Sequence, residues 1–179
     1  MRSLLFVPGD SERKLEKGFS AGADVVIVDL EDSVAPDNKP LARRLAPSAI
    51  RSRRAGGPLV YVRVNDLSTG LADDDLAAIV PARPDGIVLP KSQGAADVQH
   101  LATRLRVAEI EAGLPDGGIR IIPIVTETGL GTLSTATYPN CSPRLAGLTW
   151  GAEDLSAAIG AHTPRDEHGR YTDVFRYAR

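Results

Sequence analysis

The sequence contains very little cysteine, since Cys141 is the only one among 179 residues. A lone cysteine excludes an internal disulfide and any zinc site built from cysteines. Cys141 stands between Asn140 and Ser142, with no histidine nearby. We therefore expect an ordinary loop thiol at this position rather than a catalytic nucleophile.

Long apolar runs are missing as well. The longest, such as Val25 to Val28 and Ile121 to Val125, are far too short to span a bilayer. The opening residues Met1 to Pro8 lack the long apolar region of a signal peptide. These absences predict a cytoplasmic protein that has no membrane partner.

Neither sign of charge is in excess. The chain has 21 lysines plus arginines against 23 aspartates plus glutamates, a net charge of −2, and its basic runs are short pairs such as Arg43-Arg44. Nucleic acid is therefore not an expected partner. Because 42% of the residues are hydrophobic and 25% are charged, we expect residues 1–179 to form a single globular domain.

Short runs of apolar, β-branched residues recur along the chain, and each is followed by a polar turn and a helix-like stretch. This alternation is typical of parallel strands connected by helices. Several runs are apolar on consecutive residues, which indicates a sheet that is covered on both faces. The six predicted strands are Leu4 to Val7, Val25 to Leu30, Leu59 to Val64, Gly86 to Leu89, Ile119 to Val125 and Leu148 to Trp150.

Two α/β architectures are compatible with about six such units. A (β/α)₈ barrel usually needs about 250 residues, whereas a doubly wound sheet is complete with five or six strands. Length alone favours the open sheet, but Tyr171 to Arg179 has the pattern of a starting helix with no closing strand after it. We therefore expect a (β/α)₈ TIM barrel that is incomplete in this chain.

Charged residues at the carboxyl ends of the predicted strands are the informative positions, because functional side chains of α/β proteins gather there. In the third strand, period-two alternation places Arg63 on the same face as Leu59 and Tyr61. The planar donors of Arg63 suit a substrate carboxylate. The alternative is a structural ion pair with an acid of a neighbouring strand.

Two acids follow the last two predicted strands, Glu127 after the fifth and Asp154 after the sixth. Adjacent strand ends lie about 4.8 Å apart, so these carboxylates can share one small, hard cation such as Mg²⁺. The alternatives are an N-cap role for Asp154 and a helix-dipole role for either acid. Glu153 is the competing ligand by its position in the sequence.

Asp29, Glu31 and Asp32 lie at the end of the second strand, where they would repel one another unless water, a cation or basic residues intervene. They are candidates for orienting the water molecules of a metal or for acting as a general base, and helix capping is the alternative. Lys91, after the fourth strand, points to the same edge of the sheet. It can neutralise the acids or touch the substrate, or be a solvated loop lysine.

Six segments occur in an order that resembles the citrate lyase β-subunit and CoA-ester lyase group of the HpcH/HpaI aldolase superfamily. One such motif is weak evidence, whereas six in the right order between residue 2 and about residue 179 form a specific pattern. The segments are Arg2-Ser3-Leu4-Leu5-Phe6-Val7-Pro8-Gly9-Asp10, Asp29-Leu30-Glu31-Asp32-Ser33-Val34, Tyr61-Val62-Arg63-Val64-Asn65, Leu89-Pro90-Lys91, Glu127-Thr128 and Gly151-Ala152-Glu153-Asp154-Leu155.

The resemblance implies a (β/α)₈ barrel that forms a homotrimer or a larger oligomer and uses Mg²⁺ as its cofactor. It implies that Glu127 and Asp154 bind the metal and that Arg63, with Glu127, binds the substrate, which makes these three the expected catalytic residues. Members of the family also carry a C-terminal segment that can supply an acidic residue to a neighbouring subunit. We expect this segment to be absent from the present sequence.

The activity implied by the resemblance is the magnesium-dependent cleavage of a carbon–carbon bond in a β-hydroxyacyl thioester. A retro-Claisen reaction on a malyl-, citramalyl- or citryl-CoA would yield a thioester and a keto acid. Three alternatives stay open: a citrate lyase β-subunit acting on citryl-acyl carrier protein, an aldolase that needs no thioester, and an inactive truncated barrel that only binds a metal or a partner.

Overall fold

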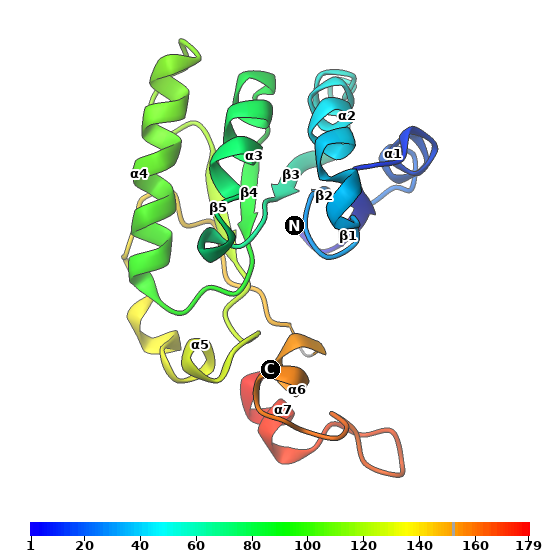
Figure 1. The fold of residues 1–179 in the computed structure, drawn as a ribbon, viewed down its shortest axis with the longest axis vertical. Helices are drawn as coiled ribbons and strands as arrows, with labels where there is room; N and C mark the ends of the chain where they lie inside the picture. Colours follow the sequence, from blue (N-terminus) through cyan, green and yellow to red (C-terminus); the bar gives the residue numbers. More distant parts are fainter. Residues whose placement is uncertain (152) are drawn as a thin grey trace.

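Five parallel strands form the centre of the computed structural model, which describes residues 1–151 and 153–179 (Figure 1). Each strand pairs in parallel with the next one along the chain, so the order in the sheet is β1-β2-β3-β4-β5. The strands are β1 (Leu4–Pro8), β2 (Val25–Asp29), β3 (Leu59–Arg63), β4 (Gly86–Leu89) and β5 (Arg120–Pro123).

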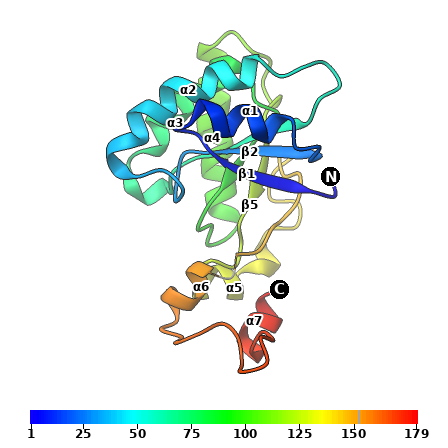
Figure 2. The same ribbon diagram turned by 90° about the vertical axis from the view of Figure 1, so that its right-hand side faces the viewer.

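The helices that connect these strands lie on one side of the sheet, as Figures 1 and 2 show. Right-handed crossovers that always step in the same direction place every helix on the same face. This is the arrangement of a barrel wall and not of a doubly wound sheet, whose strand order reverses. The helices on this side are α1 (Glu12–Phe19), α2 (Lys39–Arg51), α3 (Ala72–Ile79) and α4 (Ala95–Glu111).

The two faces of the sheet have separate apolar cores because side chains alternate along each strand. In β2, Val26 and Val28 belong to the large core between the sheet and the helices. Val25 and Ile27 belong to the smaller core on the opposite, inner face, together with Tyr61. The inner face therefore also receives Asp29 and Arg63, the next residues of the same alternation.

The sixth predicted strand, Leu148 to Trp150, forms only an isolated parallel bridge between Thr149 and Ile124. A second isolated bridge joins Leu145 to Ile121. Pro123 lies between these two bridges and has no N–H to donate, so the ladder is interrupted there. Five of the six predicted strands are therefore confirmed, and the sixth segment follows β5 without forming a regular strand.

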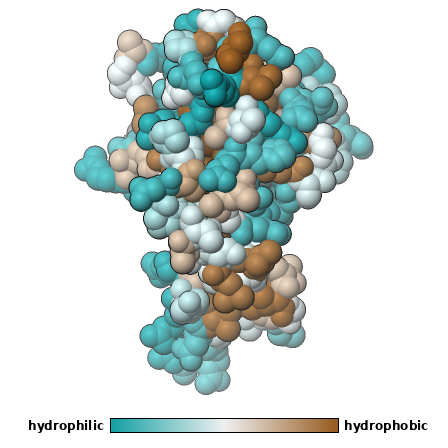
Figure 3. Space-filling view, turned by 90° about the vertical axis from the view of Figure 1, so that its left-hand side faces the viewer, coloured by the Kyte–Doolittle hydropathy of each residue, from teal (hydrophilic) through white to brown (hydrophobic). Residues whose placement is uncertain are grey.

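Three short helices lie beyond the carboxyl ends of the strands: α5 (Gly129–Leu133), α6 (Glu153–Ala158) and α7 (Asp173–Ala178). Leu155 and Phe175 form a small separate core that packs α6 against α7. Apolar side chains gather on the surface over α5, where Leu130 and Leu133 are exposed (Figure 3). None of the helices described in residues 1–151 and 153–179 has the length and apolarity needed to cross a membrane.

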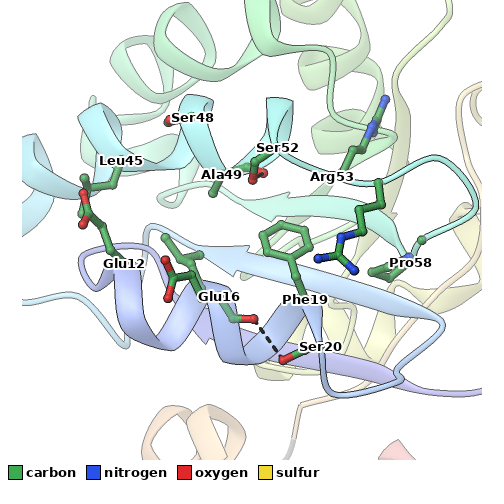
Figure 4. A pocket seen from close by; sticks show the side chains of 13 residues that line it. Glu12, Glu16, Phe19, Ser20, Leu45, Ser48, Ala49, Ser52, Arg53 and Pro58 are labelled. Carbon is green, nitrogen blue, oxygen red and sulfur yellow. Dashed lines mark hydrogen bonds between the residues drawn. The ribbon is translucent and has the colours of Figure 1, made fainter.

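A cavity of about 510 Å³ lies on the helical side, between α1 and α2 (Figure 4). Its apolar wall includes Phe19, Leu45 and Ala49, and Arg53 at its edge is held by Asp85 at 2.7 Å. No residue that the sequence singled out for chemistry lines this cavity. Those residues lie instead at the carboxyl ends of the strands.

Candidate active site

The carboxyl ends of the strands bring all seven predicted site residues into one connected group, which we call the rim cluster. Asp29 ends β2, and two further acids lie in the turn after it. Arg63 ends β3, and the turns after β4 and β5 and the first turn of α6 carry one residue each. Five carboxylates and two cations give a net charge of −3 when all are ionised. The rim cluster consists of Asp29, Glu31, Asp32, Arg63, Lys91, Glu127 and Asp154.

Asp29 and Arg63 form a bidentate ion pair across the β2–β3 register. Arg63 Nε donates to Asp29 Oδ1 at 2.8 Å, and Nη2 donates to Oδ2 at 2.7 Å. Burial would raise the pKa of Asp29, but the hydrogen bonds and charge of Arg63 outweigh it and hold the pKa below its usual range. The structural ion pair considered as an alternative for Arg63 is therefore present.

The third guanidinium nitrogen of Arg63, Nη1, is not used by Asp29 and faces other acids. Its Nη1 lies 3.0 Å from Glu31 Oε2 and 3.4 Å from Asp32 Oδ2. Its guanidinium plane is covered by the ring of Phe6, 4.8 Å away, which the sequence reasoning did not single out. The guanidinium is thus held rigidly, with Nη1 directed at the acids of the cluster.

Lys91 connects the acids that follow β2 with Glu127 and Asp154. Its Nζ donates to Glu31 Oε1 and lies 3.6 Å from Asp32 and 3.4 Å from Asp154. Its backbone N–H donates to Glu127 Oε2 at 2.6 Å. Lys91 also has a positive φ of 52°, which is uncommon for a residue with a side chain. It is therefore not a freely solvated loop lysine.

Glu127 is buried, with 5% of its surface exposed. Burial, together with repulsion from Asp154 and Glu31, raises its pKa to about 7. The N-cap of α5 is Thr128, whose hydroxyl accepts from the N–H of Gly131, so Glu127 is not needed as a cap. Its Oε2 accepts from the backbone N–H of Lys91, and neither carboxylate oxygen is used to cap α5.

The side chain of Glu127 occupies the space that a side chain at position 151 would need. A Cβ at Gly151 would lie 2.7 Å from Glu127 Cγ, which is closer than carbon atoms approach without displacement. Because Gly151 has no side chain, its backbone can lie directly beside Glu127. Asp154 itself lies in the first turn of α6, while its neighbour Glu153 is exposed.

Magnesium fits the residues of the rim cluster. Oε2 of Glu31 and Oδ2 of Asp154 are buried and accept no hydrogen bond from any residue that the structure describes, although Arg63 and Lys91 lie within ion-pair distance of them. Unsatisfied carboxylate oxygens in a cluster of net negative charge are what a divalent cation would stabilise. In the part of the chain that the structure describes, no three or more His, Cys, Asp or Glu side chains are arranged so that they could together hold a metal ion. The arrangement suits a cation that keeps water or substrate oxygens as further ligands.

Glu127 gives the metal-free protein a pH dependence of stability. Its folded pKa of about 7 lies above its ordinary value of 4.5, so between these values the folded state holds a proton that the unfolded state has released. This group therefore destabilises the fold as the pH rises through that window. We expect the melting temperature in EDTA to fall more between pH 5 and pH 7.5 for the native protein than for Glu127→Gln. Equal falls in the two proteins would contradict the raised pKa.

Comparison with known proteins identifies the family of this chain. The family model described as HpcH/HpaI aldolase/citrate lyase matches residues 2–179. A (3S)-malyl-CoA thioesterase of Cereibacter sphaeroides is 37% identical over 162 residues, which cover 89% of this chain and 52% of the relative. A citrate lyase subunit beta of Leuconostoc mesenteroides is 33% identical over 161 residues, covering 90% of this chain and 53% of the relative.

The solved structures add a neighbour that contains a metal. The protein CitE of Mycobacterium tuberculosis, crystallised with magnesium and acetoacetate, superimposes with a TM-score of 0.77 and 34% sequence identity. The match covers 98% of this chain and 64% of that protein. The chain thus spans about half the length of the curated relatives it matches and somewhat more of the solved structure.

Proposed function

Because this chain belongs to the HpcH/HpaI aldolase/citrate lyase family, we propose that it acts as a magnesium-dependent lyase that breaks a carbon–carbon bond in a β-hydroxyacyl thioester. The observation that carries the proposal is the rim cluster. It places unsatisfied carboxylate oxygens beside a rigidly held arginine at the carboxyl edge of a barrel wall. The magnesium in the similar CitE structure supports the choice of metal.

In this proposal Glu127 and Asp154 hold the magnesium ion. When bound, the ion supplies Lewis-acid stabilisation for the negative charge that develops on the keto-acid half of the substrate. Arg63 orients the substrate carboxylate through Nη1, the part of the guanidinium that Asp29 does not occupy. Glu127 lies next to the same substrate oxygens and helps to position them.

A base must take the proton of the substrate hydroxyl before the carbon–carbon bond breaks. Asp29 is poorly suited to this task, because both of its oxygens are occupied by Arg63 and by groups of Glu31 and Ser33. Among the acids after β2, Glu31 and Asp32 are the candidates. The bond electrons pass to the thioester half as an enolate, which takes up a proton and leaves as the shortened thioester.

The proposal is tested by incubating the protein with malyl-CoA, citramalyl-CoA and citryl-CoA, with Mg²⁺ or with EDTA. We expect Mg²⁺-dependent formation of a keto acid, or of glyoxylate from malyl-CoA, together with a shorter acyl-CoA. Citryl-acyl carrier protein forms a parallel arm, because the Leuconostoc relative is named as a citrate lyase subunit. Cleavage of the carrier-bound substrate alone would assign the chain to the citrate lyase reaction.

The relative named as a (3S)-malyl-CoA thioesterase favours a second candidate function, hydrolysis of the thioester. The same assay distinguishes the two reactions. A lyase releases glyoxylate and acetyl-CoA from malyl-CoA, whereas a thioesterase releases malate and free CoA. Free CoA without glyoxylate would therefore replace the lyase proposal with hydrolysis.

We also propose that the protein works in the cytoplasm as a homo-oligomer of three or more copies, as the family resemblance implies. Exposed apolar side chains over α5, including Leu130 and Leu133, support an assembly (Figure 3). Sedimentation analysis of the purified protein tests this point, and a monomer at micromolar concentration would contradict it.

A further inference from the structure

Two side chains outside the rim cluster hold the backbone that carries its acids. The carbonyl oxygen of Leu30 accepts from Lys39 Nζ at 2.7 Å and from Asn65 Nδ2 at 3.1 Å. The carbonyl oxygen of Glu31 accepts from Lys39 Nζ at 2.8 Å and from the N–H of Val34 at 3.0 Å. Because a carbonyl oxygen has two lone pairs, each of these oxygens has its full set of hydrogen bonds.

These bonds set the direction of the Glu31 side chain. The two carbonyl groups belong to the rigid peptide planes on either side of the Glu31 Cα. The N–H of Glu31 is held as well, by Asp29 Oδ1 at 2.9 Å. With both planes held, the Cα–Cβ bond of Glu31 has one direction. In this direction the Glu31 carboxylate reaches Lys91 and Arg63 and so lies in the rim cluster.

Asn65 is itself anchored and cannot replace Lys39. The buried carboxylate of Asp75 accepts from the backbone N–H and the Nδ2 of Asn65, both at 2.7 Å. The other oxygen of Asp75 accepts from Arg43 Nε at 2.7 Å. Asn65 reaches only the Leu30 carbonyl, whereas Lys39 joins both carbonyls.

The charge of Lys39 suits this position. Its ammonium group makes charge-assisted hydrogen bonds, which are stronger than those between neutral groups. Burial holds the pKa of Lys39 below its usual value, and Asp29, Glu31, Asp75 and Asp32 act in the opposite direction. The carboxylates near it outnumber the cations, so a positive charge behind the loop also reduces the repulsion among the acids.

We propose that Lys39 is a positioning residue of the active site, which together with Asn65 holds Glu31 in the orientation that the rim cluster requires. The inference rests on the proposed function, because the orientation acts through magnesium binding and bond cleavage. Lys39 touches neither the substrate nor the metal in this scheme. It acts through the Leu30 and Glu31 carbonyl oxygens.

The test compares Lys39→Met, which removes the donors, with Lys39→Arg, which keeps a cation and several donors. Lys14→Met is the matched control, because Lys14 is exposed on α1. Trp150 is the only tryptophan and stands next to Gly151 beside Glu127, so its fluorescence can report Mg²⁺ binding. We expect Lys39→Met to weaken Mg²⁺ binding or to lower kcat by about tenfold, as loss of an outer-shell partner does. Lys39→Arg should recover part of the loss, and Lys14→Met should behave as native.

A double-variant cycle separates positioning from a general loss of stability. If Lys39 acts through Glu31, the double variant Lys39→Met with Glu31→Gln should lose no more Mg²⁺ affinity and no more kcat than Glu31→Gln alone. Additive losses would overturn the proposal, as would native Mg²⁺ affinity and native kcat in Lys39→Met.

The proposed function can fail independently of this inference. If the native protein neither binds Mg²⁺ nor cleaves a thioester, the function is wrong, and amide hydrogen exchange at Glu31 and Ser33 decides the positioning role. Both amides donate to Asp29 in the native structure. Faster exchange at these amides in Lys39→Met, but not in Lys14→Met, would support the role, and unchanged exchange would overturn it.

Discussion

Asp154→Asn and Glu127→Gln should each lower the magnesium-dependent cleavage rate by about 10³-fold, because the Lewis-acid stabilisation that they would lose is worth several kcal/mol. Both substitutions keep the shape of the side chain and remove its charge. Among residues 1–151 and 153–179, no group donates a hydrogen bond to the buried Asp154 Oδ2, and Glu127 lies near it in the same cluster. The measurement is kcat/KM at saturating Mg²⁺, together with Mg²⁺ affinity from Trp150 fluorescence.

Glu153→Gln is the matched control for this prediction. Glu153 precedes Asp154 in α6 and was the competing ligand from the sequence, but its side chain is exposed. We expect Glu153→Gln to retain native activity and Mg²⁺ affinity. If Glu153→Gln lost activity and Asp154→Asn kept it, the ligand assignment would be wrong. Circular dichroism of each variant checks that the fold is intact.

Arg144→Met should lower the free energy of unfolding by about 3–5 kcal/mol, because it leaves a buried carboxylate without its cation. Glu109 is fully buried, and Arg144 donates to its two oxygens at 3.1 and 2.6 Å. Arg144 also donates to Asp116 at 2.6 Å and to the carbonyl of Ile119 at 3.0 Å. The pair therefore joins α4 to β5 and to the segment that follows, and urea denaturation at 25 °C measures its loss.

Arg106→Met provides the control, since Arg106 pairs with the same Asp116 at 3.3 Å but is two-thirds exposed. Exposed ion pairs contribute about 0–1 kcal/mol, so little change is expected. Replacing both members of the buried pair, in Glu109→Leu with Arg144→Met, should recover part of the stability. Similar losses of unfolding free energy in Arg106→Met and Arg144→Met would show that the burial of an ion pair does not decide how much it stabilises the fold.

The candidate site could be predicted from the sequence to the extent that its residues stand at strand ends. Arg63, Glu127 and Asp154 follow apolar runs, and parallel strands bring such positions to one edge. The contacts among them could not be predicted in the same way. Lys39 and Asn65 come from α2 and from the turn after β3, and nothing in their local sequence indicates that both reach the Leu30 carbonyl.

The tertiary structure also decided between the alternatives that the sequence left open for several residues. Arg63 meets Asp29 in a bidentate pair and directs Nη1 at Glu31, so the structural ion pair is confirmed for this residue. Lys91 is engaged by acids rather than solvated. The assignment of metal-binding and substrate-binding roles to these residues stays a prediction.

The sequence by itself determined the α/β class, five of the six parallel strands that it predicted and the edge at which the charged residues gather. These follow from local periodicity and from the rule that parallel strands share one carboxyl edge. Only the tertiary structure decided that Leu148 to Trp150 is not a regular strand and that Glu109 and Arg144 form a buried pair. The physical reason is that ladder hydrogen bonds and ion pairs depend on groups distant in the chain, whose approach is set by packing and not by local pattern.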